Sequence, residues 1–329
     1  MSERGVDHAD GVREMIWLQV SVVRPIGGST MMRLCSEFHL SVLTTVAVLA
    51  CAVAVTARVP HGSSEKRIIV TVLDAQNRPV AGLPPDAFVI REDNIDREIV
   101  KVERADDPVA TVLFADTTSA FGKYVGDLRT VTQAFIKEFF DKNPGSSLGL
   151  WEFGEADIPI VDLTTDAAKL NHGATRLFPK GSEQNVVGSA LLEGIVSASK
   201  RLATRPERRR VIVSFNTDVS VEVSRMPGQR VQDAVQNAGV TLFALSINNN
   251  TTNGPLRDNV LNELCPYSGG KRLTIVDIAS LESALKNIAD VLGSQYAVTY
   301  TRPSGSAKQV LVGIRRNGLK ASTARWAPK

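Results

Sequence analysis

The stretch "VLFADTTSAFG" (residues 112–122) is the part of the sequence that decides the fold. Its first half belongs to the continuous apolar run "ATVLFAD" (110–116), which is typical of a strand buried on both faces. Downstream, "GDLRTVTQAFIKEFFDK" (126–142) repeats apolar residues three or four positions apart, the spacing of an amphipathic helix. A buried strand followed by such a helix is the unit from which parallel sheets are built.

The same alternation continues to residue 294. Two adjacent runs, "SSLGLWEFG" (146–154) and "IPIVDL" (158–163), predict an antiparallel pair of strands. The elements predicted after them are helices at 186–203, 228–239, 255–265 and 280–294, and strands at 209–218, 240–248 and 272–276. Residues 108–294 are therefore predicted to form a Rossmann-like α/β domain, a mostly parallel sheet with helices on both faces.

Period-two alternation flanks this central region on both sides. Residues 66–104 alternate apolar and polar side chains and are interrupted by Asn, Gly and Pro, which favour turns. They predict a small all-β module of about three or four strands, too small to be very stable alone and expected to pack on the domain that follows. Residues 295–329 contain two further period-two segments and predict C-terminal strands and a tail.

The N-terminal segment is expected to lie outside the fold. From Met32 on, a basic start, an apolar stretch and small residues up to Ala57 form the three-part layout of a secretory signal. The apolar stretch is shorter than the ~20 residues that a membrane-spanning helix needs, which favours cleavage over a membrane anchor. Residues 1–31 precede that signal and indicate a start codon placed too far upstream. Residues 1–57 are thus predicted to be a mistranslated leader followed by a signal peptide at 32–57.

Lipidation at Cys51 is the alternative to cleavage, because "VLAC" loosely resembles the motif at which lipoproteins are modified. Either route predicts an exported protein, periplasmic or secreted, whose only membrane contact is the signal peptide or a lipid anchor. Cys35 and Cys51 lie in the signal, so the mature chain keeps only Cys265 and forms no internal disulfide. We expect Cys265 to be a small apolar helix residue.

Charge says little about partners. The chain has 38 basic and 35 acidic residues, and this balance does not indicate a nucleic-acid partner. The basic run "RPERRR" (205–210) is interpreted as a solvated helix end rather than an anion site.

Two of the predicted buried strands end in an acid, at Asp116 and Asp218. Ligands of parallel sheets bind beyond the carboxyl ends of the strands, so both acids are expected at the same edge. Hydroxyl side chains follow Asp116, and the polar cluster "GSEQN" (181–185) stands before a helix. Oxygen groups converging from three loops suit a hard divalent cation such as Mg²⁺. The alternative is that the acids only cap the following helices or turns, and composition does not decide between the two.

The order of elements and the segments "VLFADTTSA", "NVVGSALLEGI" and "RRRVIVSFNTD" resemble a von Willebrand factor type A (VWFA, or vWA) domain. The resemblance implies a metal-ion-dependent adhesion site, built from an Asp-x-Ser-x-Ser motif after the first strand, a Thr from a second loop and an Asp from a third. More narrowly, the front module and the tail resemble the exported VWFA-related domain proteins of acidobacteria. The resemblance covers residues 67–328.

The resemblance assigns the site position by position. Asp116 matches the first acid, and Thr118 matches the first serine and keeps a hydroxyl. Ala120 stands where the second serine is expected and offers no ligand. Asn185 replaces the usual threonine with an amide oxygen, and Asp218 matches the last acid. The predicted metal ligands are therefore Asp116, Thr118, Asn185 and Asp218, a degenerate site for Mg²⁺, Mn²⁺ or Ca²⁺.

Two classes of function remain open. The first is an exported module that binds or adheres to a protein of the envelope or the extracellular space through the carboxyl edge of the sheet. In intact sites of the resembled family, the ion leaves one position for a carboxylate of the partner. The alternative is a metal-assisted hydrolase in which Asp116 and Asp218 hold Mg²⁺ and activate water. Binding is favoured and no catalytic residue is predicted, because the sequence has no phosphate-cradling glycine loop, HExxH motif or nucleophile elbow.

Overall fold

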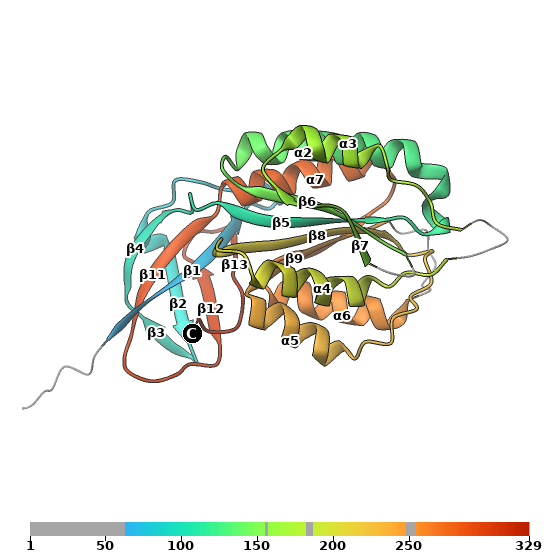
Figure 1. Ribbon diagram of the computed structural model, residues 1–329. Coiled ribbons are helices and arrows are strands. Elements are labelled where there is room, and N and C mark those ends of the chain that lie inside the picture. The colour runs from blue at the N-terminus through green and yellow to red at the C-terminus, as the bar shows by residue number, and fades with distance from the viewer. Residues whose placement is uncertain (1–62, 155–156, 182–186, 248–253, 329) are drawn as a thin grey trace, which may run out of the picture. The chain divides into compact units, whose positions relative to one another are not determined.

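The structure is a computed structural model, and the residues that it describes are 63–154, 157–181, 187–247 and 254–328 (Figure 1). The predicted leader and signal peptide (1–57), the candidate lipidation site Cys51 and the predicted ligand Asn185 lie outside the described residues. No helix within the described ranges is long and apolar enough to cross a membrane.

A six-stranded sheet in the order β10-β9-β8-β5-β6-β7 forms the centre of the fold. Its strands are β5 (Val109–Asp116), β6 (Ser147–Phe153), β7 (Asp157–Thr164), β8 (Arg209–Thr217), β9 (Val240–Ile247) and β10 (Lys271–Ile275). Neighbouring strands are parallel, except that β7 runs antiparallel to β6. The predicted mostly parallel sheet and the predicted antiparallel pair are thereby confirmed.

Helices cover both faces of this sheet (Figure 1). One face carries α2 (Val125–Lys142), α3 (Ala167–Ala174) and α7 (Ala279–Gly293), and the other carries α4 (Leu191–Ala203), α5 (Gly228–Ala238) and α6 (Pro255–Tyr267). Short 3-10 turns, η1 (Pro85–Ala87) and η2 (Ser119–Tyr124), precede β2 (Phe88–Glu92) and α2. The apolar positions predicted for α2 are buried at Leu128, Val131, Phe135 and Phe139. Because both faces of the sheet are covered, β5 is buried along its whole length.

The strands before and after the central domain pair with one another, and together they form what we call the β unit. One of its sheets has the order β13-β1-β11-β4 and the other the order β12-β2-β3. The strands are β1 (Ser64–Leu73), β2 (Phe88–Glu92), β3 (Ile95–Arg97), β4 (Ile99–Arg104), β11 (Tyr296–Arg302), β12 (Val310–Ile314) and β13 (Lys320–Ser322). Buried side chains from both sheets, such as Val70, Ile90 and Val298, form one apolar core. The segments 66–104 and 295–329, although far apart in sequence, therefore share a core.

The β unit also buries a carboxylate, that of Glu92. Arg302 Nε donates hydrogen bonds to its two oxygens at 3.0 and 2.9 Å, and the Tyr300 hydroxyl donates to it as well. Arg97 Nε donates to Oε2 at 3.1 Å. Burial by itself raises the pKa of Glu92, but the hydrogen bonds and positive charges around it outweigh burial and hold the pKa below its usual value.

Arg209, at the start of β8, joins the β unit to the central domain. Its guanidinium is buried and donates to the carbonyl oxygens of Ala105 and Leu292 and to the side-chain oxygen of Gln295. Burial lowers the pKa of Arg209 to about 10. The interpretation of the basic run 205–210 as a solvated helix end is thus wrong for Arg209. Its hydrogen-bond acceptors are carbonyl oxygens of the chain and not water, and a sequence pattern does not show which carbonyl oxygens lie near a side chain.

Replacing the buried carboxylate with an amide, in Glu92→Gln, should lower the free energy of unfolding at neutral pH by about 3–5 kcal/mol, because Arg302 then stays buried without a counter-charge. The pKa of Glu92 is lower in the folded state than the ordinary value of 4.5 that it has in the unfolded chain, so its stabilisation is complete above that value and is lost as pH falls through the folded pKa. The difference between the two proteins should therefore shrink below about pH 4. Urea denaturation at several pH values measures it.

Glu103→Gln is the matched control, because the Glu103 carboxylate pairs with Lys101 at the surface. Its loss should cost at most about 1 kcal/mol. Equal losses for the two variants would contradict a structural role of the buried cluster.

Candidate functional site

The carboxyl edge of the central sheet brings the two predicted acids together. Asp116 is the last residue of β5, and Asp218 directly follows β8. The two strands are parallel neighbours, with Ala115 paired to Phe215, so both chains leave the sheet at the same edge. The N–H of Asp218 donates to the carbonyl oxygen of Ile247, at the end of β9, at 3.0 Å. The prediction that both acids lie at one edge is confirmed.

Asp116 is fully buried and accepts hydrogen bonds on both carboxylate oxygens. Oδ1 accepts from the N–H of Thr118 at 2.9 Å. Oδ2 accepts from the N–H of Thr217 at 3.1 Å and from the hydroxyl of Ser220 at 2.9 Å. Burial raises the pKa of Asp116, and these hydrogen bonds partly offset the rise. The carboxylate therefore connects the end of β5 to the loop that follows β8.

The Ser220 hydroxyl lies between two of the predicted metal ligands. It donates to Asp116 Oδ2, and its oxygen is 2.7 Å from Thr118 Oγ1. To bind Asp116 and Thr118 directly, an Mg²⁺ ion about 2.1 Å from each oxygen would have to displace the hydrogen bonds that the Ser220 hydroxyl makes with both side chains. The contacts of Asp116 and Thr118 therefore do not fit a cation held directly by both side chains.

Asp218 has arginine side chains as its charge partners. Its Oδ1 lies 3.6 Å from Arg272 Nη2 and 4.0 Å from Arg257 Nη2, and among the described residues Oδ1 finds no hydrogen-bond donor. Burial and, after it, the charge of Asp258 raise the pKa of Asp218, whereas the two arginines lower it. The two arginines therefore compensate the negative charge of Asp218 in part.

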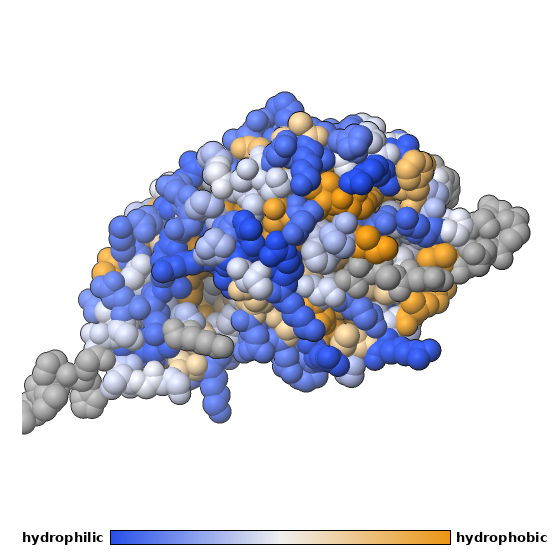
Figure 2. Space-filling view, viewed as in Figure 1, coloured by the Kyte–Doolittle hydropathy of each residue, from blue (hydrophilic) through white to orange (hydrophobic). Residues whose placement is uncertain are grey.

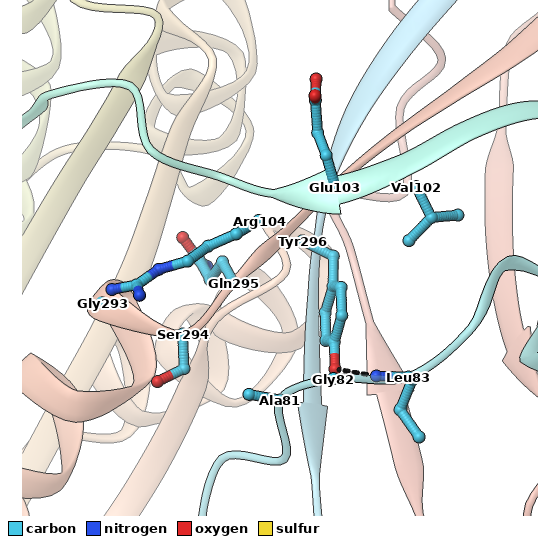
Figure 3. A pocket seen from close by; sticks show the side chains of 10 residues that line it. All are labelled: Ala81, Gly82, Leu83, Val102, Glu103, Arg104, Gly293, Ser294, Gln295 and Tyr296. Carbon is cyan, nitrogen blue, oxygen red and sulfur yellow. Dashed lines mark hydrogen bonds between the residues drawn. The ribbon is translucent and has the colours of Figure 1, made fainter.

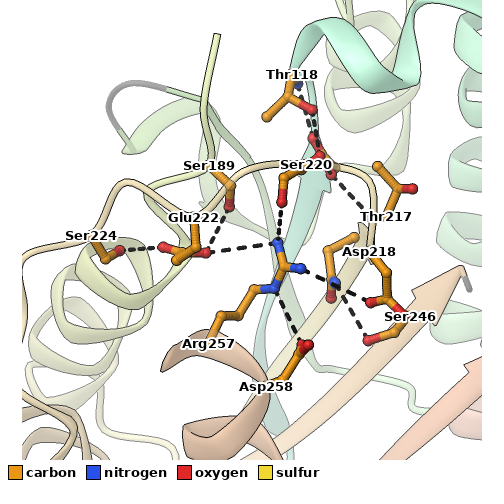
Figure 4. Close-up of polar contacts among 12 residues, drawn as sticks. Thr118, Ser189, Thr217, Asp218, Ser220, Glu222, Ser224, Ser246, Arg257 and Asp258 are labelled. Carbon is orange, nitrogen blue, oxygen red and sulfur yellow. Dashed lines mark hydrogen bonds and ion pairs between the residues drawn. The ribbon is translucent and has the colours of Figure 1, made fainter. Parts of the chain in front are cut away.

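Arg257 is a central residue that the sequence analysis did not single out (Figure 4). Its side chain is fully buried, and Nη1 donates to the carbonyl oxygen of Ser220 at 3.1 Å. Arg257 lies in the first turn of α6, where the helix dipole disfavours a positive charge. An arginine in the first turn of a helix is therefore unusual, and α6 follows β9, which ends at the same edge as Asp218. These two features of the sequence could have identified Arg257 as a site residue.

The remaining predicted ligand, Asn185, lies outside the described residues, so the assignment of a metal site stays a prediction. Within the part of the chain that the structure describes, no group of three or more His, Cys, Asp or Glu side chains is arranged to hold a metal ion. Ser220 was also missed by sequence reasoning, although it stands only two residues after Asp218.

A separate cavity of about 280 Å³ lies where the β unit meets the end of α7 (Figure 3). The Tyr296 hydroxyl on its wall accepts from the N–H of Leu83 at 3.1 Å and donates to the carbonyl oxygen of Val80 at 2.8 Å. Gln295 is likewise used, since its side chain accepts from Arg209 and donates to Thr71. These polar groups of the wall already have partners within the chain, and the cavity gives no reason to move the candidate site away from the carboxyl edge.

Removal of the hydroxyl in Ser220→Ala should lower the free energy of unfolding by about 1–3 kcal/mol, because the buried Asp116 carboxylate and the Thr118 hydroxyl each lose a partner. Urea denaturation measures the change. Ser280→Ala is the control, since the exposed Ser280 hydroxyl also donates to a carboxylate, that of Asp277, and should cost less than about 0.5 kcal/mol. A Ser220 variant as stable as the control would show that this contact does not hold the edge together.

Neither protein-family models nor curated proteins match the sequence. Solved structures do resemble it. The vWF domain of the type V pili tip protein Mfa5 from Porphyromonas gingivalis is 14% identical, over 56% of this chain and 95% of that chain, with a TM-score of 0.42. A von Willebrand factor type A protein from Catenulispora acidiphila is 12% identical, over 80% of this chain and 74% of that chain, with a TM-score of 0.46.

Proximal thread matrix protein 1 from the mussel byssus is 14% identical over 63% of this chain, with a TM-score of 0.46, and this chain spans 51% of its length. At these identities and TM-scores, the similarity carries no site, partner or activity from those proteins to this chain. The strand order, the antiparallel edge strand β7 and the helices on both faces are observed directly. The chain therefore has the mostly parallel α/β fold predicted from its sequence and is similar to solved vWA domains, and the narrower relationship to the acidobacterial proteins stays a prediction.

Proposed function

We propose that this chain is an exported protein that binds another protein through an apolar rim at the carboxyl edge of its central sheet. The observation that carries the proposal is the distribution of exposed large apolar side chains. Most of those in the described residues lie at this edge, and we call them the apolar rim: Ile158, Phe178, Val219, Val221, Val223, Leu256 and Val276. The others are Ile95, Val100 and Leu311 in the β unit.

The rim is assembled from loops and element ends that meet at the edge. Three of its valines (219–223) follow β8, Leu256 begins α6 after β9, and Val276 follows β10. Ile158 pairs with Glu152 near the end of β6. Phe178 stands two residues before Lys180, whose N–H donates to the carbonyl oxygen of Thr117 just beyond β5.

Exposed apolar side chains that gather in one region are typical of protein-binding surfaces, whereas single ones scattered over a surface need no explanation. Val276 is 82% exposed and Phe178 is 55% exposed, so both are available to a partner. Figure 2 shows hydrophobic side chains at the end of the molecule where this edge lies. Loops held by a rigid sheet are also where binding residues commonly occur.

The proposed partner is a protein of the envelope or the extracellular space, and no feature of the described surface favours nucleic acid. Export rests on the predicted signal peptide, and the mature protein would be periplasmic or secreted, with lipid anchoring at Cys51 as the alternative. A divalent cation (Mg²⁺, Mn²⁺ or Ca²⁺) held by Asp116, Thr118, Asn185 and Asp218 stays a prediction. Binding through the rim does not require it.

The alternative of a metal-assisted hydrolase receives no support from the described residues. Asp116 directs both of its oxygens to hydrogen-bond donors of the chain, and Asp218 pairs with arginines. An ion that activates water would have to displace the hydrogen bonds of Asp116 and would lie beside the arginines that face Asp218. We therefore propose a binding protein and not an enzyme.

A rim variant, Val221→Glu with Val276→Glu, should lose its partner. The exported chain is immobilised and exposed to the envelope and extracellular fractions of its host, and captured proteins are quantified by mass spectrometry. Placing two charges in an apolar contact should reduce capture of the specific partner at least about tenfold, while the free energy of unfolding changes by less than about 1 kcal/mol.

The control is Ile95→Glu with Val100→Glu, which adds the same charges at comparably exposed positions of the β unit. It should capture the partner as well as the unmodified chain does. Equal capture by the rim variant and the control would overturn the proposed role of the rim.

A further inference from the structure

The guanidinium of Arg257 is enclosed by carboxylates on separate sides (Figure 4). Arg257 Nε lies 3.6 Å from Asp258 Oδ1, Nη1 lies 3.8 Å from Glu222 Oε2, and Nη2 lies 4.0 Å from Asp218 Oδ1. The Arg257 side chain is fully buried, and those of Glu222, Asp218 and Asp258 are 2%, 11% and 15% exposed. Arg257 is thus a buried positive charge with three carboxylates around it. A second cation shares two of them, because Arg272 Nη2 lies 2.8 Å from Asp258 Oδ1 and 3.6 Å from Asp218 Oδ1.

The chain is shaped to receive this side chain. Gly254, at the N-terminus of α6, lies against the guanidinium, and a Cβ atom on it would come within 3.0 Å of Arg257 Cζ and 3.1 Å of Glu222 Cβ. A side chain at position 254 would therefore require the guanidinium to shift by a few tenths of an ångström. On the other side, Arg257 Nη1 is fixed by the carbonyl oxygen of Ser220.

Burying a charged arginine costs several kcal/mol unless opposite charges and acceptors surround it. Arginine does not escape this cost by losing its proton, since it stays charged at any ordinary pH. Within the described chain, Nε and Nη2 of Arg257 have no hydrogen-bond acceptor, so the carboxylates compensate the burial chiefly by attraction through space. Conversely, Asp218 and Glu222 owe part of their neutralisation to Arg257.

We propose that Arg257 is the built-in cation of the carboxyl edge, whose guanidinium neutralises the acids there and orders the loop after β8 without a divalent ion. This inference rests on the proposed function, because it takes the apolar rim to be the surface that binds the partner. It adds that Arg257 is the residue that orders part of this surface.

The link from Arg257 to the rim runs through a few contacts. Arg257 holds the carbonyl of Ser220, and the Ser220 hydroxyl holds Asp116 at the end of β5. Glu222, beside Arg257, accepts hydrogen bonds from the hydroxyls of Ser189 and Ser224. The rim valines of this loop alternate with Ser220 and Glu222, so the inward contacts of these two residues set the outward direction of the valines.

The first test measures thermal unfolding of the unmodified chain with MgCl₂, MnCl₂ or CaCl₂, each compared with NaCl at the same ionic strength and with EDTA. The expected result is no change in melting temperature, because the edge already carries its cation. A ligand present at ten times its dissociation constant would raise the melting temperature by about 3–5 °C. A saturable rise of that size with any of these ions, reversed by EDTA, would overturn the proposal.

The second test removes the charge. Arg257→Met should lower the melting temperature by about 6–20 °C, because the buried Glu222 loses its counter-charge and Asp218 and Asp258 keep only Arg272. Adding Glu222→Gln to this variant should recover part of the loss, whereas Glu222→Gln alone should lower the melting temperature. Arg201→Met is the matched control, since Arg201 pairs with Asp162 at the surface and should shift the melting temperature by at most about 4 °C.

A charge-retaining variant, Arg257→Lys, covers the case in which Arg257→Met does not fold, and it should unfold at a higher temperature than Arg257→Met. Absence of any recovery on adding Glu222→Gln would count against charge neutralisation. These melting temperatures are measured without a partner, so their outcome does not depend on the outcome of the capture experiment. A rim variant that still captures the partner would overturn the proposed function and leave the role of Arg257 intact.

Discussion

A guanidinium sealed from water must find its acceptors and counter-charges inside the chain, and this constraint recurs wherever parts of the fold meet. Arg302 meets Glu92 inside the β unit. Arg209 meets carbonyl oxygens where the β unit joins the central domain, and Arg257 meets carboxylates at the carboxyl edge. The apolar cores supply most of the driving force for folding, but apolar contact is not directional. The buried arginines fix which segments meet and in what orientation.

Much of the central domain could be predicted because its signals are local. A parallel strand buried on both faces is a continuous apolar run, as at 110–116 and 209–218, and an amphipathic helix shows its spacing within a few turns. The pairing of the β unit could not be predicted in this way. Period two indicates that a segment is a strand, but it does not identify the neighbouring strand, and β11 lies between β1 and β4 through contacts distant in sequence. The short helix α3 was missed because eight residues give too little periodicity.

For the candidate site, too, local features could be predicted from the sequence and contacts between distant segments could not. Strand ends predicted the edge where Asp116 and Asp218 meet, because that follows from parallel pairing alone. The contacts of these acids could not be predicted. The sequence shows that Ala120 lacks a hydroxyl, but the hydroxyl beside Asp116 belongs to Ser220, which approaches only because β8 pairs with β5. A sequence motif shows which residues follow one strand. The chemistry of the site also depends on side chains from the loop after a neighbouring strand, here Ser220 after β8.

A carboxyl edge whose cation is a buried arginine should bind a partner differently from an edge that binds a divalent ion from solution. Where a divalent ion is bound, the ion can also bind a carboxylate of the partner. Charge then contributes directly to affinity, and a chelator that removes the ion abolishes binding. With Arg257 buried among acids of its own chain, that charge is used before any partner arrives. Under the proposed function, affinity comes from apolar area, at roughly 25 cal/mol for each Å² removed from water, and from the rigidity of the loops that present it. The internal ion pairs and the exposed valines of one loop are thus two parts of one arrangement, in which the inward-facing charges hold the outward-facing apolar surface in place.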